Sequence, residues 1–499
     1  MSGVDELPLR RRVARLGWLT LGLSGLSLVL LALAAWAALS GRSTHGIGRL
    51  PVAAKDAVPS ISFILAAGAA AAGAFVGLAA LHTAAAMRVL ARDRRIPPPL
   101  PPEVRRVRTA VLAPLGHEAA RLVSPRTTPP PSKLLDAPTL PLRLTVLVPA
   151  HDESLTIAAT LRSLWGQTRP PEKVVVVADN CTDDTPDIAR EHGAEVFETT
   201  GNHEKKAGAL NQVLTEMFPR IDERDVVMIM DADSIIVPDF VEVSLARLTD
   251  DPALIAVGGL FGGEPGAGVV GQLQRNEYAR YQRTIGRRRG RVFVLTGTAS
   301  LFRAYALKAV ADARGELIPG VPGHVYDTLA MTEDNEITLA LKSLGAKMVS
   351  PMQCQVVTEL MPNWHALWRQ RSRWQRGALE NIGAYGVTRA TARYWGQQLG
   401  IGYGTIALNA YFLLMTVTLL SADGFEIIWF WAILGMVFVV ERVVTVWPAG
   451  WRARLIALPL LIELAYDLFL QAVYVKSLID IASGRSAGWN YVPRKAVAT

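Results

Sequence analysis

The 499-residue sequence predicts an α/β domain with a mostly parallel sheet, covered by helices on both faces and flanked by transmembrane α-helices. Long uncharged runs lie near both ends of the chain, and between them short β-branched runs alternate with helical stretches. Only 19% of the residues are charged and 50% are hydrophobic, whereas globular domains carry roughly a quarter charged residues. The composition therefore agrees with membrane segments around a folded middle region.

Two apolar runs near the N-terminus predict retained membrane helices. Residues 16–41 contain no charged side chain, and residues 61–87 form a second run rich in Ala and Gly. Each exceeds the roughly 20 residues that cross a bilayer, and a signal peptide has a shorter apolar region. Four arginines within residues 1–15 precede the first run and four follow the second, whereas the loop between holds three basic residues. The positive-inside rule then places the N-terminus and the middle region in the cytoplasm of a multi-pass cell-membrane protein.

Residues 394–484 predict about three further transmembrane or interfacial helices. These are Tyr394–Ala422, Phe425–Trp447 and Leu455–Val475. Glu463 and Asp467 are four residues apart and share one helical face. Such carboxylates either face neighbouring helices or line a path for a polar substrate, and a third interpretation places the segments in the membrane interface. Three crossings would put the tail at 485–499 outside, but its basic residues favour the inside, so the number of crossings stays open.

A Pro- and Arg-rich linker at residues 88–141 precedes the middle region. Its prolines resist regular structure, and its arginines suit a segment that runs along anionic headgroups. The cytoplasmic α/β domain is expected at residues 142–362, followed by amphipathic interfacial helices at 363–393.

Strands and helices alternate at the start of the middle region. The expected elements are a strand at Leu144–Val148, a helix at Leu155–Trp165, a strand at Val174–Ala178, a helix at Pro186–His192 and a strand at Val226–Met230. This order favours a parallel sheet covered on both faces. In such sheets, ligands bind beyond the carboxyl ends of the strands.

Acidic residues follow all three predicted strands. They lie in Pro149–Ser154, in Ala178–Thr185 and in Asp231–Ser234. A cluster of carboxylates is repulsive unless a cation lies among them. The D-x-D pair, Asp231 and Asp233, suits a hard divalent cation, Mg²⁺ or Mn²⁺, which would also hold a diphosphate.

Four motifs, in chain order, resemble those of membrane-bound family 2 glycosyltransferases, in particular the processive synthases of cellulose, chitin, hyaluronan and poly-N-acetylglucosamine. The motifs are Asp179, Asp231-Ala232-Asp233, Thr332-Glu333-Asp334 and Gln370-Arg371-Ser372-Arg373-Trp374. The resemblance covers about Leu144 to Gly377 and implies a GT-A-type nucleotide-sugar transferase domain, with a hexosyltransferase activity of class EC 2.4.1.-.

The resemblance implies a role for each matching residue. Asp334 would be the catalytic base, with Glu333 beside it, while Asp231 and Asp233 would hold the metal. Residues matching the nucleotide-sugar site are Pro149, Ala150, Asp152, Glu153, Asp179, Lys206, Asp231 and Ala232. Residues matching the acceptor and diphosphate site are Thr296, Gly297, Thr298, Gln370, Arg373 and Trp374. The chain departs from the family at Ala178-Asp179-Asn180-Cys181, where Asp-Asp-Gly-Ser is common, so one acid is missing.

The implied reaction is an inverting, metal-dependent transfer from a UDP-sugar to a growing β-linked polysaccharide at the cytoplasmic membrane face. UDP-N-acetylglucosamine and UDP-glucose are the expected donors. One carboxylate suffices as base for the attacking hydroxyl, and a metal with a cationic side chain stabilises the leaving diphosphate. About five crossings are few for a polymer channel, so export would need an accessory subunit or an oligomer. The alternative is a single transfer to a lipid or polyprenyl-phosphate acceptor, although simpler synthases of that type usually lack Q-x-x-R-W.

Several of these features also have simpler interpretations. Glu333 and Asp334 could merely cap a helix, because acids favour the first turn, and Trp364–Arg376 has the spacing of an amphipathic helix at the membrane interface. Cys181 and Cys354 predict neither a disulfide framework nor a zinc module. The net charge of +8 is concentrated near membrane edges, which disfavours nucleic-acid binding. A transporter or receptor that only binds nucleotide leaves Asp334 unexplained.

Overall fold

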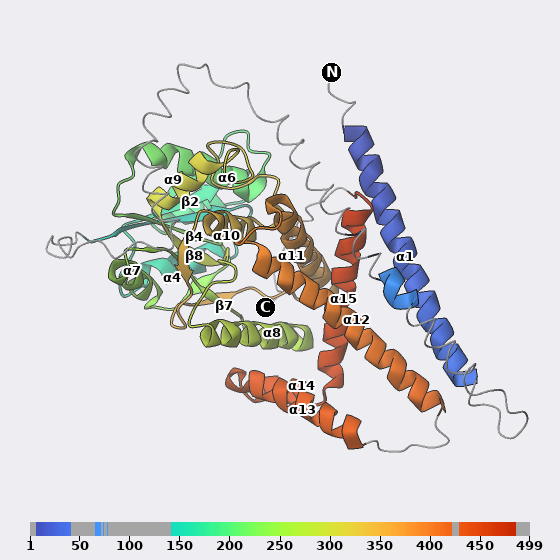
Figure 1. Cartoon of the computed structure of the whole chain (residues 1–499). Coiled ribbons are helices and arrows are strands. Elements are labelled where there is room, and N and C mark those ends of the chain that lie inside the picture. The colour runs from blue at the N-terminus through green and yellow to red at the C-terminus, as the bar shows by residue number, and fades with distance from the viewer. Residues whose placement is uncertain are drawn as a thin grey trace, which may run out of the picture. The chain divides into compact units, whose positions relative to one another are not determined.

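The computed structural model describes residues 6–40, 65–70, 73, 77, 141–421 and 429–485 (Figure 1). The chain divides into two compact units, each described by itself below. The unit with the sheet comprises Arg92–Gln370, Arg442–Pro459 and Asn490–Thr499, and the helical unit comprises Met1–Ala91, Arg371–Glu441 and Leu460–Trp489. Apart from residues 141 and 485, the predicted linker and tail lie outside the described residues, as does most of the second predicted membrane helix.

Seven strands form the main sheet, in the order β3-β2-β1-β4-β8-β6-β9. They are β1 Arg143–Ala150, β2 Lys173–Ala178, β3 Glu195–Glu198, β4 Asp225–Met230, β6 Leu254–Gly258, β8 Ala299–Arg303 and β9 Lys347–Val349. β1 runs parallel to β2 and β4, and β2 to β3, whereas β8 is antiparallel to β4 and β6. The mostly parallel sheet confirms the predicted fold class, and the first three predicted strands are β1, β2 and β4.

Helices cover both faces of this sheet (Figure 1). They are α4 Ile157–Trp165, α5 Thr185–Glu191, α6 Lys205–Met217, α7 Phe240–Asp250, α8 Gly268–Arg287, α9 Ala304–Ala313 and α10 Glu333–Ser343, with a 3-10 turn, η2, at Phe218–Arg220. Because side chains alternate along a strand, β4 sends Met228 into the core that also contains Leu161 of α4 and Leu245 of α7. Ile229 lies on the opposite face, where it lines a cavity beside α6 and α10.

A second, three-stranded sheet joins residues that are far apart in the sequence. Its order is β5-β10-β7, with β5 at Ile235–Ile236, β7 at Leu260–Gly263 and β10 at Gln355–Thr358. β10 is antiparallel to β5, with Val356 opposite Ile236 and Val357 opposite Ile235. Glu359 directly follows β10, and Asp233 lies two residues before β5.

The segment between residues 442 and 459 packs on α8 of the sheet-containing unit. It includes the 3-10 turn η3 at Trp447–Ala449 and helix α14 at Trp451–Ala457. Asn276 of α8 donates from Nδ2 to the Ala453 carbonyl at 3.3 Å, and Arg280 donates to Thr445 Oγ1 at 3.3 Å.

The segment Leu455–Val475, expected to form a single helix, is broken in the structure. Helix α14 ends at Ala457 and α15, Leu461–Ala482, begins four residues later. Pro459 lies in the break, and proline has no backbone N–H with which to continue a helix. Leu460 has a φ of +51°, a left-handed conformation that also stops the preceding helix.

The helical unit contains α1 Glu6–Ser40, α12 Ala392–Ser421, α15 and most of α13 Trp429–Thr445, together with most of α11 Trp364–Tyr385. Among the described residues, one helix is long and apolar enough to cross a membrane, at Ala14–Leu33 within α1. α14 and α15 pass the same test only if they form one broken span. One or two membrane helices are thus supported, and the multi-pass arrangement stays a prediction.

Close packing joins the helices within this unit. A Cβ on Gly17 would lie 1.9 Å from the Ala482 carbonyl oxygen, so only glycine permits this approach of α1 to α15. Tyr474 of α15 donates its hydroxyl to the Gln398 carbonyl of α12 at 3.1 Å. Glu463 is fully buried, which agrees with the expectation that its carboxylate faces other helices.

Candidate active site

The carboxyl ends of β1 and β2 bring several predicted nucleotide-site residues together. His151 Nδ1 lies 2.6 Å from the Asp179 carbonyl oxygen, which links the two strand ends. Asp179 Oδ1 accepts from Thr199 Oγ1 at 2.8 Å, Asn202 Nδ2 at 2.7 Å and Asn180 Nδ2 at 3.0 Å. These three donors fix the orientation of the buried Asp179 carboxylate.

Other predicted residues at these ends have local structural roles. Ala150 is the last residue of β1, after Pro149. Glu153 accepts from Thr156 Oγ1 at 3.0 Å at the start of α4. Asp152 has a φ of +53°, a conformation in which Asn and Asp are enriched, so either residue suits this turn. Ala232 is buried, and its carbonyl accepts from the Thr160 hydroxyl at 2.8 Å.

Lys206 connects two of the predicted motifs. Its Nζ lies 2.5 Å from Asp231 Oδ1, after β4, and 3.1 Å from Glu333 Oε1, at the start of α10. Burial lowers the pKa of Lys206, but Asp231 and Glu333 outweigh burial and raise it above its ordinary value. Lys206 therefore stays charged and holds the D-x-D turn against the first turn of α10.

Gly297 adjoins the same group from a third segment. A Cβ at this position would lie 3.3 Å from Lys206 Nζ, 3.5 Å from Asp231 Oδ2 and 3.8 Å from Asp334 Cβ. Thr298 accepts from the Asp231 amide at 3.3 Å, and its hydroxyl bonds to that of Thr296 at 3.0 Å. A cavity here is lined by Lys206, Leu210, Ile229, Leu295, Thr296, Gly297, Ser300, Phe302, Tyr326, Glu333, Asp334 and Ile337. The structure thus brings predicted residues from three separate segments to one cavity, and Asp231 adjoins it through its ion pair with Lys206.

Gly297→Ala tests whether the space beside Lys206 and Asp334 is needed for catalysis. We expect roughly a tenfold loss of kcat, because small displacements of catalytic groups are costly, with little change in thermal stability. Gly262→Ala is the matched control, since its Cβ would meet only ordinary contacts at 3.7 and 3.8 Å. Steady-state kinetics and thermal unfolding of both variants make the test, and equal activity of the two would show that this space is not used.

Asp334 has the electrostatic properties of a general base. Burial and the charge of Glu333 raise its pKa to about 6, although Lys206 and a hydrogen bond from the Asn335 amide oppose the rise. That bond to Asp334 Oδ1 is 2.7 Å long. A carboxylate with this pKa is ionised at neutral pH and still accepts a proton readily, as general-base catalysis requires.

The raised pKa predicts an acid limb in the pH profile. Asp334 is protonated and inactive as a base below about pH 6, so kcat/KM should fall about tenfold per unit below that pH and level off above it. Glu333→Gln removes a neighbouring negative charge and should move the limb to lower pH. Initial rates between about pH 5 and pH 8 check both expectations, and a flat profile across that range would contradict them.

Asp233 faces an acid that the sequence motifs did not indicate. Burial, Asp231 and Glu359 raise the pKa of Asp233 to about 7. The pKa of Glu359 is itself raised, by burial and by Glu264. Glu359 lies 126 residues after Asp233 in the chain, and the pairing of β10 with β5 brings their two segments together. Carboxylates that repel one another in this way are the donor set that a hard divalent cation stabilises, so Asp231 and Asp233 fit the predicted metal.

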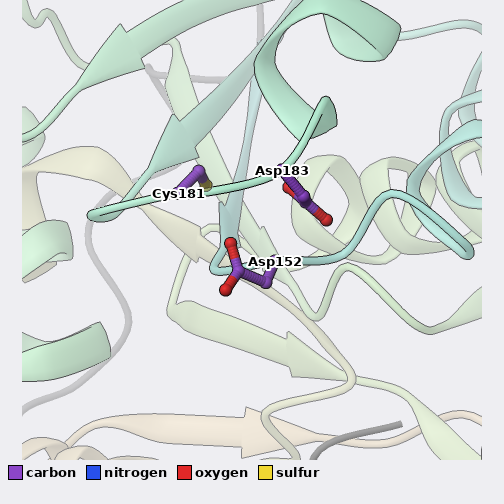
Figure 2. Close-up of side chains that lie close together, drawn as sticks. All are labelled: Asp152, Cys181 and Asp183. Carbon is purple, nitrogen blue, oxygen red and sulfur yellow. The ribbon is translucent and has the colours of Figure 1, made fainter. Parts of the chain in front are cut away.

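A second acidic group, Asp152, Cys181 and Asp183, lies at the ends of β1 and β2 (Figure 2). Its carboxylates already accept hydrogen bonds from the surrounding loops. Asp152 accepts from the Thr182 amide at 2.6 Å, and Asp183 accepts from the Ser154 amide at 3.0 Å. Burial raises the pKa of the Cys181 thiol, which disfavours the thiolate that binds metals. Loop hydrogen bonding explains this group better than a metal does.

The Q-x-x-R-W motif lies on α11, as expected for a helix. The boundary between the two units falls within the motif. Gln370 belongs to the sheet-containing unit, whereas Arg373 and Trp374 belong to the helical unit. The Arg371 guanidinium stacks 4.4 Å from the Trp374 ring centroid. The role of Arg373 and Trp374 at the acceptor or diphosphate stays a prediction.

Comparison with known proteins identifies the sheet-containing region. Residues 141–377 match the family described as "Glycosyltransferase like family 2". This domain belongs to glycosyltransferase family 2. The family 2 domain has the GT-A-like α/β fold described above.

Curated relatives of the family 2 domain include poly-beta-1,6-N-acetyl-D-glucosamine synthases. That of Staphylococcus aureus (strain COL) is 26% identical over 243 residues, which is 48% of this chain and 55% of the relative. That of Staphylococcus epidermidis is 24% identical over 250 residues, with the same shares. The chain spans about half the length of the curated relatives it matches. A mannosyltransferase from Pyrobaculum calidifontis, solved with GDP-Man and Mn²⁺, has a TM-score of 0.46 and 19% identity over 74% of this chain and 95% of that one.

Proposed function

We propose that this glycosyltransferase transfers the sugar of a UDP-sugar, UDP-N-acetylglucosamine or UDP-glucose, with inversion at the anomeric carbon and release of UDP, to a growing β-linked polysaccharide at the cytoplasmic membrane face. The observation that carries the proposal is the position of Asp334. Asp334 lines the same cavity as Lys206 and Glu333, and Lys206 is ion-paired to both Asp231 and Glu333. A base, a cation and the D-x-D turn thus adjoin one space where a sugar could react.

The chain's own residues account for the proton and for orientation. Asp334 accepts the proton of the attacking hydroxyl as the new bond to the anomeric carbon forms and the bond to the diphosphate breaks. Lys206 keeps Asp231 and Glu333 at fixed distances around that space. Inversion follows because one displacement, with no covalent intermediate, changes the anomeric configuration once.

Asp231 and Asp233 would hold Mg²⁺ or Mn²⁺. Such an ion, when bound, neutralises charge on the leaving diphosphate. Glu359 adds negative charge near Asp233 and would strengthen the attraction for a cation.

The polymeric acceptor rests on the similarity to poly-beta-1,6-N-acetyl-D-glucosamine synthases and on the Q-x-x-R-W sequence at Gln370, Arg373 and Trp374. The apolar helix α1 is consistent with a membrane location. The alternative acceptor is a lipid or polyprenyl phosphate, which would receive a single sugar. An accessory subunit or an oligomer would be needed if the product is exported through the chain's own helices.

Product analysis with a radiolabelled donor distinguishes these acceptors. The detergent-purified chain is incubated with each labelled UDP-sugar and Mn²⁺ or Mg²⁺, and the products are separated by size and by solvent extraction. We expect a high-molecular-weight product that disappears when EDTA removes the metal. A short product that partitions into organic solvent would instead support the single transfer to a lipid.

A further inference from the structure

Tyr326 lies in the cavity beside Asp334, on the loop that connects α9 to α10, and no sequence motif points to it. The side chain is only 3% exposed and lines the cavity with Lys206, Glu333 and Asp334. Among the described residues, the hydrogen bonds of Tyr326 are made by its backbone alone, and its phenol hydroxyl has no hydrogen-bond partner. The hydroxyl is not among the fully buried polar atoms of the described residues, so it keeps access to the cavity that Tyr326 lines and is available to a ligand there.

The backbone around Tyr326 is fixed from two sides. Asn211 of α6 donates from Nδ2 to the Tyr326 carbonyl at 2.9 Å and accepts from the Tyr326 amide, also at 2.9 Å. Arg314, which is fully buried, donates to the carbonyls of His324 and Val325 and forms an ion pair with Glu336 of α10 at 2.5 Å. The loop is therefore joined to the helix that carries Lys206 and to the helix that carries Asp334.

The charges around the phenol favour a neutral ligand group. Burial raises the pKa of Tyr326, and Glu333, Asp334 and Glu336 raise it further, against the opposing effect of Lys206. The hydroxyl is therefore protonated at neutral pH and can donate a hydrogen bond. The three carboxylates outnumber the single ammonium group of Lys206, so their negative charge disfavours a phosphate beside Tyr326. A sugar hydroxyl is uncharged and can accept a hydrogen bond from the phenol.

We propose that Tyr326 binds a hydroxyl group of the transferred sugar and so contributes to the choice of donor. The inference rests on the proposed function, because it assigns one wall of the same site. The donor sugar is favoured over the acceptor because Tyr326 shares the cavity with Lys206, which is paired to Asp231 of the D-x-D turn. Asn211 and the Arg314–Glu336 pair act as positioning residues for this contact.

The test compares Tyr326→Phe with the wild-type chain on a series of UDP-sugars that each lack one hydroxyl of the sugar ring. The phenylalanine keeps the ring and removes only the hydroxyl. We expect kcat/KM for the complete donor to fall roughly three- to tenfold, as for one hydrogen bond between neutral groups. Wild type should show the same loss with one deoxy donor, and Tyr326→Phe should show no further loss with that donor. Affinity for UDP should not change, and Tyr305→Phe on α9 serves as the control.

Three results would overturn the inference. Tyr326→Phe could retain full activity. It could also lose activity equally with every donor, which would show that the hydroxyl only maintains the structure of the loop. The difference in activity between wild type and Tyr326→Phe could instead disappear with an acceptor that lacks one hydroxyl, which would show that Tyr326 binds the acceptor. If wild type released UDP from no UDP-sugar while remaining folded, the proposed function itself would be wrong, and the inference would fall with it.

Discussion

Asp334→Asn is expected to lower kcat by about 10²- to 10⁴-fold, the usual contribution of a general base, while the affinity for UDP changes little. Asparagine has nearly the same shape as aspartate but cannot accept the proton of the attacking hydroxyl. Asp334 already accepts a hydrogen bond from the Asn335 amide through Oδ1, and the asparagine carbonyl can keep that bond. The fold should therefore survive the substitution. UDP release and equilibrium UDP binding measure the two effects separately.

Asp250→Asn provides the matched control for this variant. Asp250 is exposed at the end of α7, so the same chemical change there should leave kcat and UDP binding as in wild type. Near-normal turnover of Asp334→Asn would show that another group acts as the base. A parallel loss of UDP binding would show that Asp334 holds the nucleotide and not the proton.

Arg314→Met is expected to destabilise the sheet-containing unit by about 3–5 kcal/mol, the cost of leaving one partner of a buried ion pair uncompensated. Arg314 and Glu336 have side chains that are 0% and 1% exposed, and they are joined at 2.5 and 2.8 Å. Arg314 also donates to the Pro319 carbonyl at 2.7 Å. The single substitution would remove these bonds and leave the Glu336 carboxylate buried.

The double variant Arg314→Met, Glu336→Leu separates the charge from the packing. Removing both charges should recover much of the lost stability, because a buried ion pair replaced by apolar residues is often close to neutral. Thermal unfolding of the purified chain compares the two variants. A single variant as stable as the double variant would contradict the importance of the pair. Activity should stay low in the double variant, since the loop that carries Tyr326 loses the hydrogen bonds of Arg314.

Much of the sheet-containing unit could be predicted from the sequence, because strands, helices and strand ends follow from residue patterns within short stretches of the chain. Alternating strands and helices predicted the parallel strands β1, β2 and β4. The rule that ligands bind at the carboxyl ends of such strands predicted that Asp179 and the D-x-D turn lie at one edge. The T-E-D motif matched a helix start, which the structure places at Glu333. Local rules do not predict that the D-x-D turn and the T-E-D motif meet at Lys206 and Gly297; only the motif resemblance anticipated this.

Residues that depend on long-range pairing could not be found this way. Glu359 comes near Asp233 through the antiparallel pairing of β5 and β10, two short strands without a clear sequence pattern. Tyr326 and Arg314 lie in or beside an irregular loop, where neither a helical nor a strand period applies. The apolar run at Leu455–Val475 is divided into α14 and α15 by a feature that is visible in the sequence, Pro459.

UDP release by the purified chain is the decisive measurement of sugar transfer from a UDP-sugar donor. The chain, with Mn²⁺ or Mg²⁺, is given a panel of UDP-sugars, with Asp334→Asn and EDTA as controls. We expect metal-dependent release of UDP from one donor, UDP-N-acetylglucosamine or UDP-glucose, that Asp334→Asn abolishes. Release that is unaffected by Asp334→Asn, or an absence of release from every UDP-sugar by a chain that binds none of them, would contradict it.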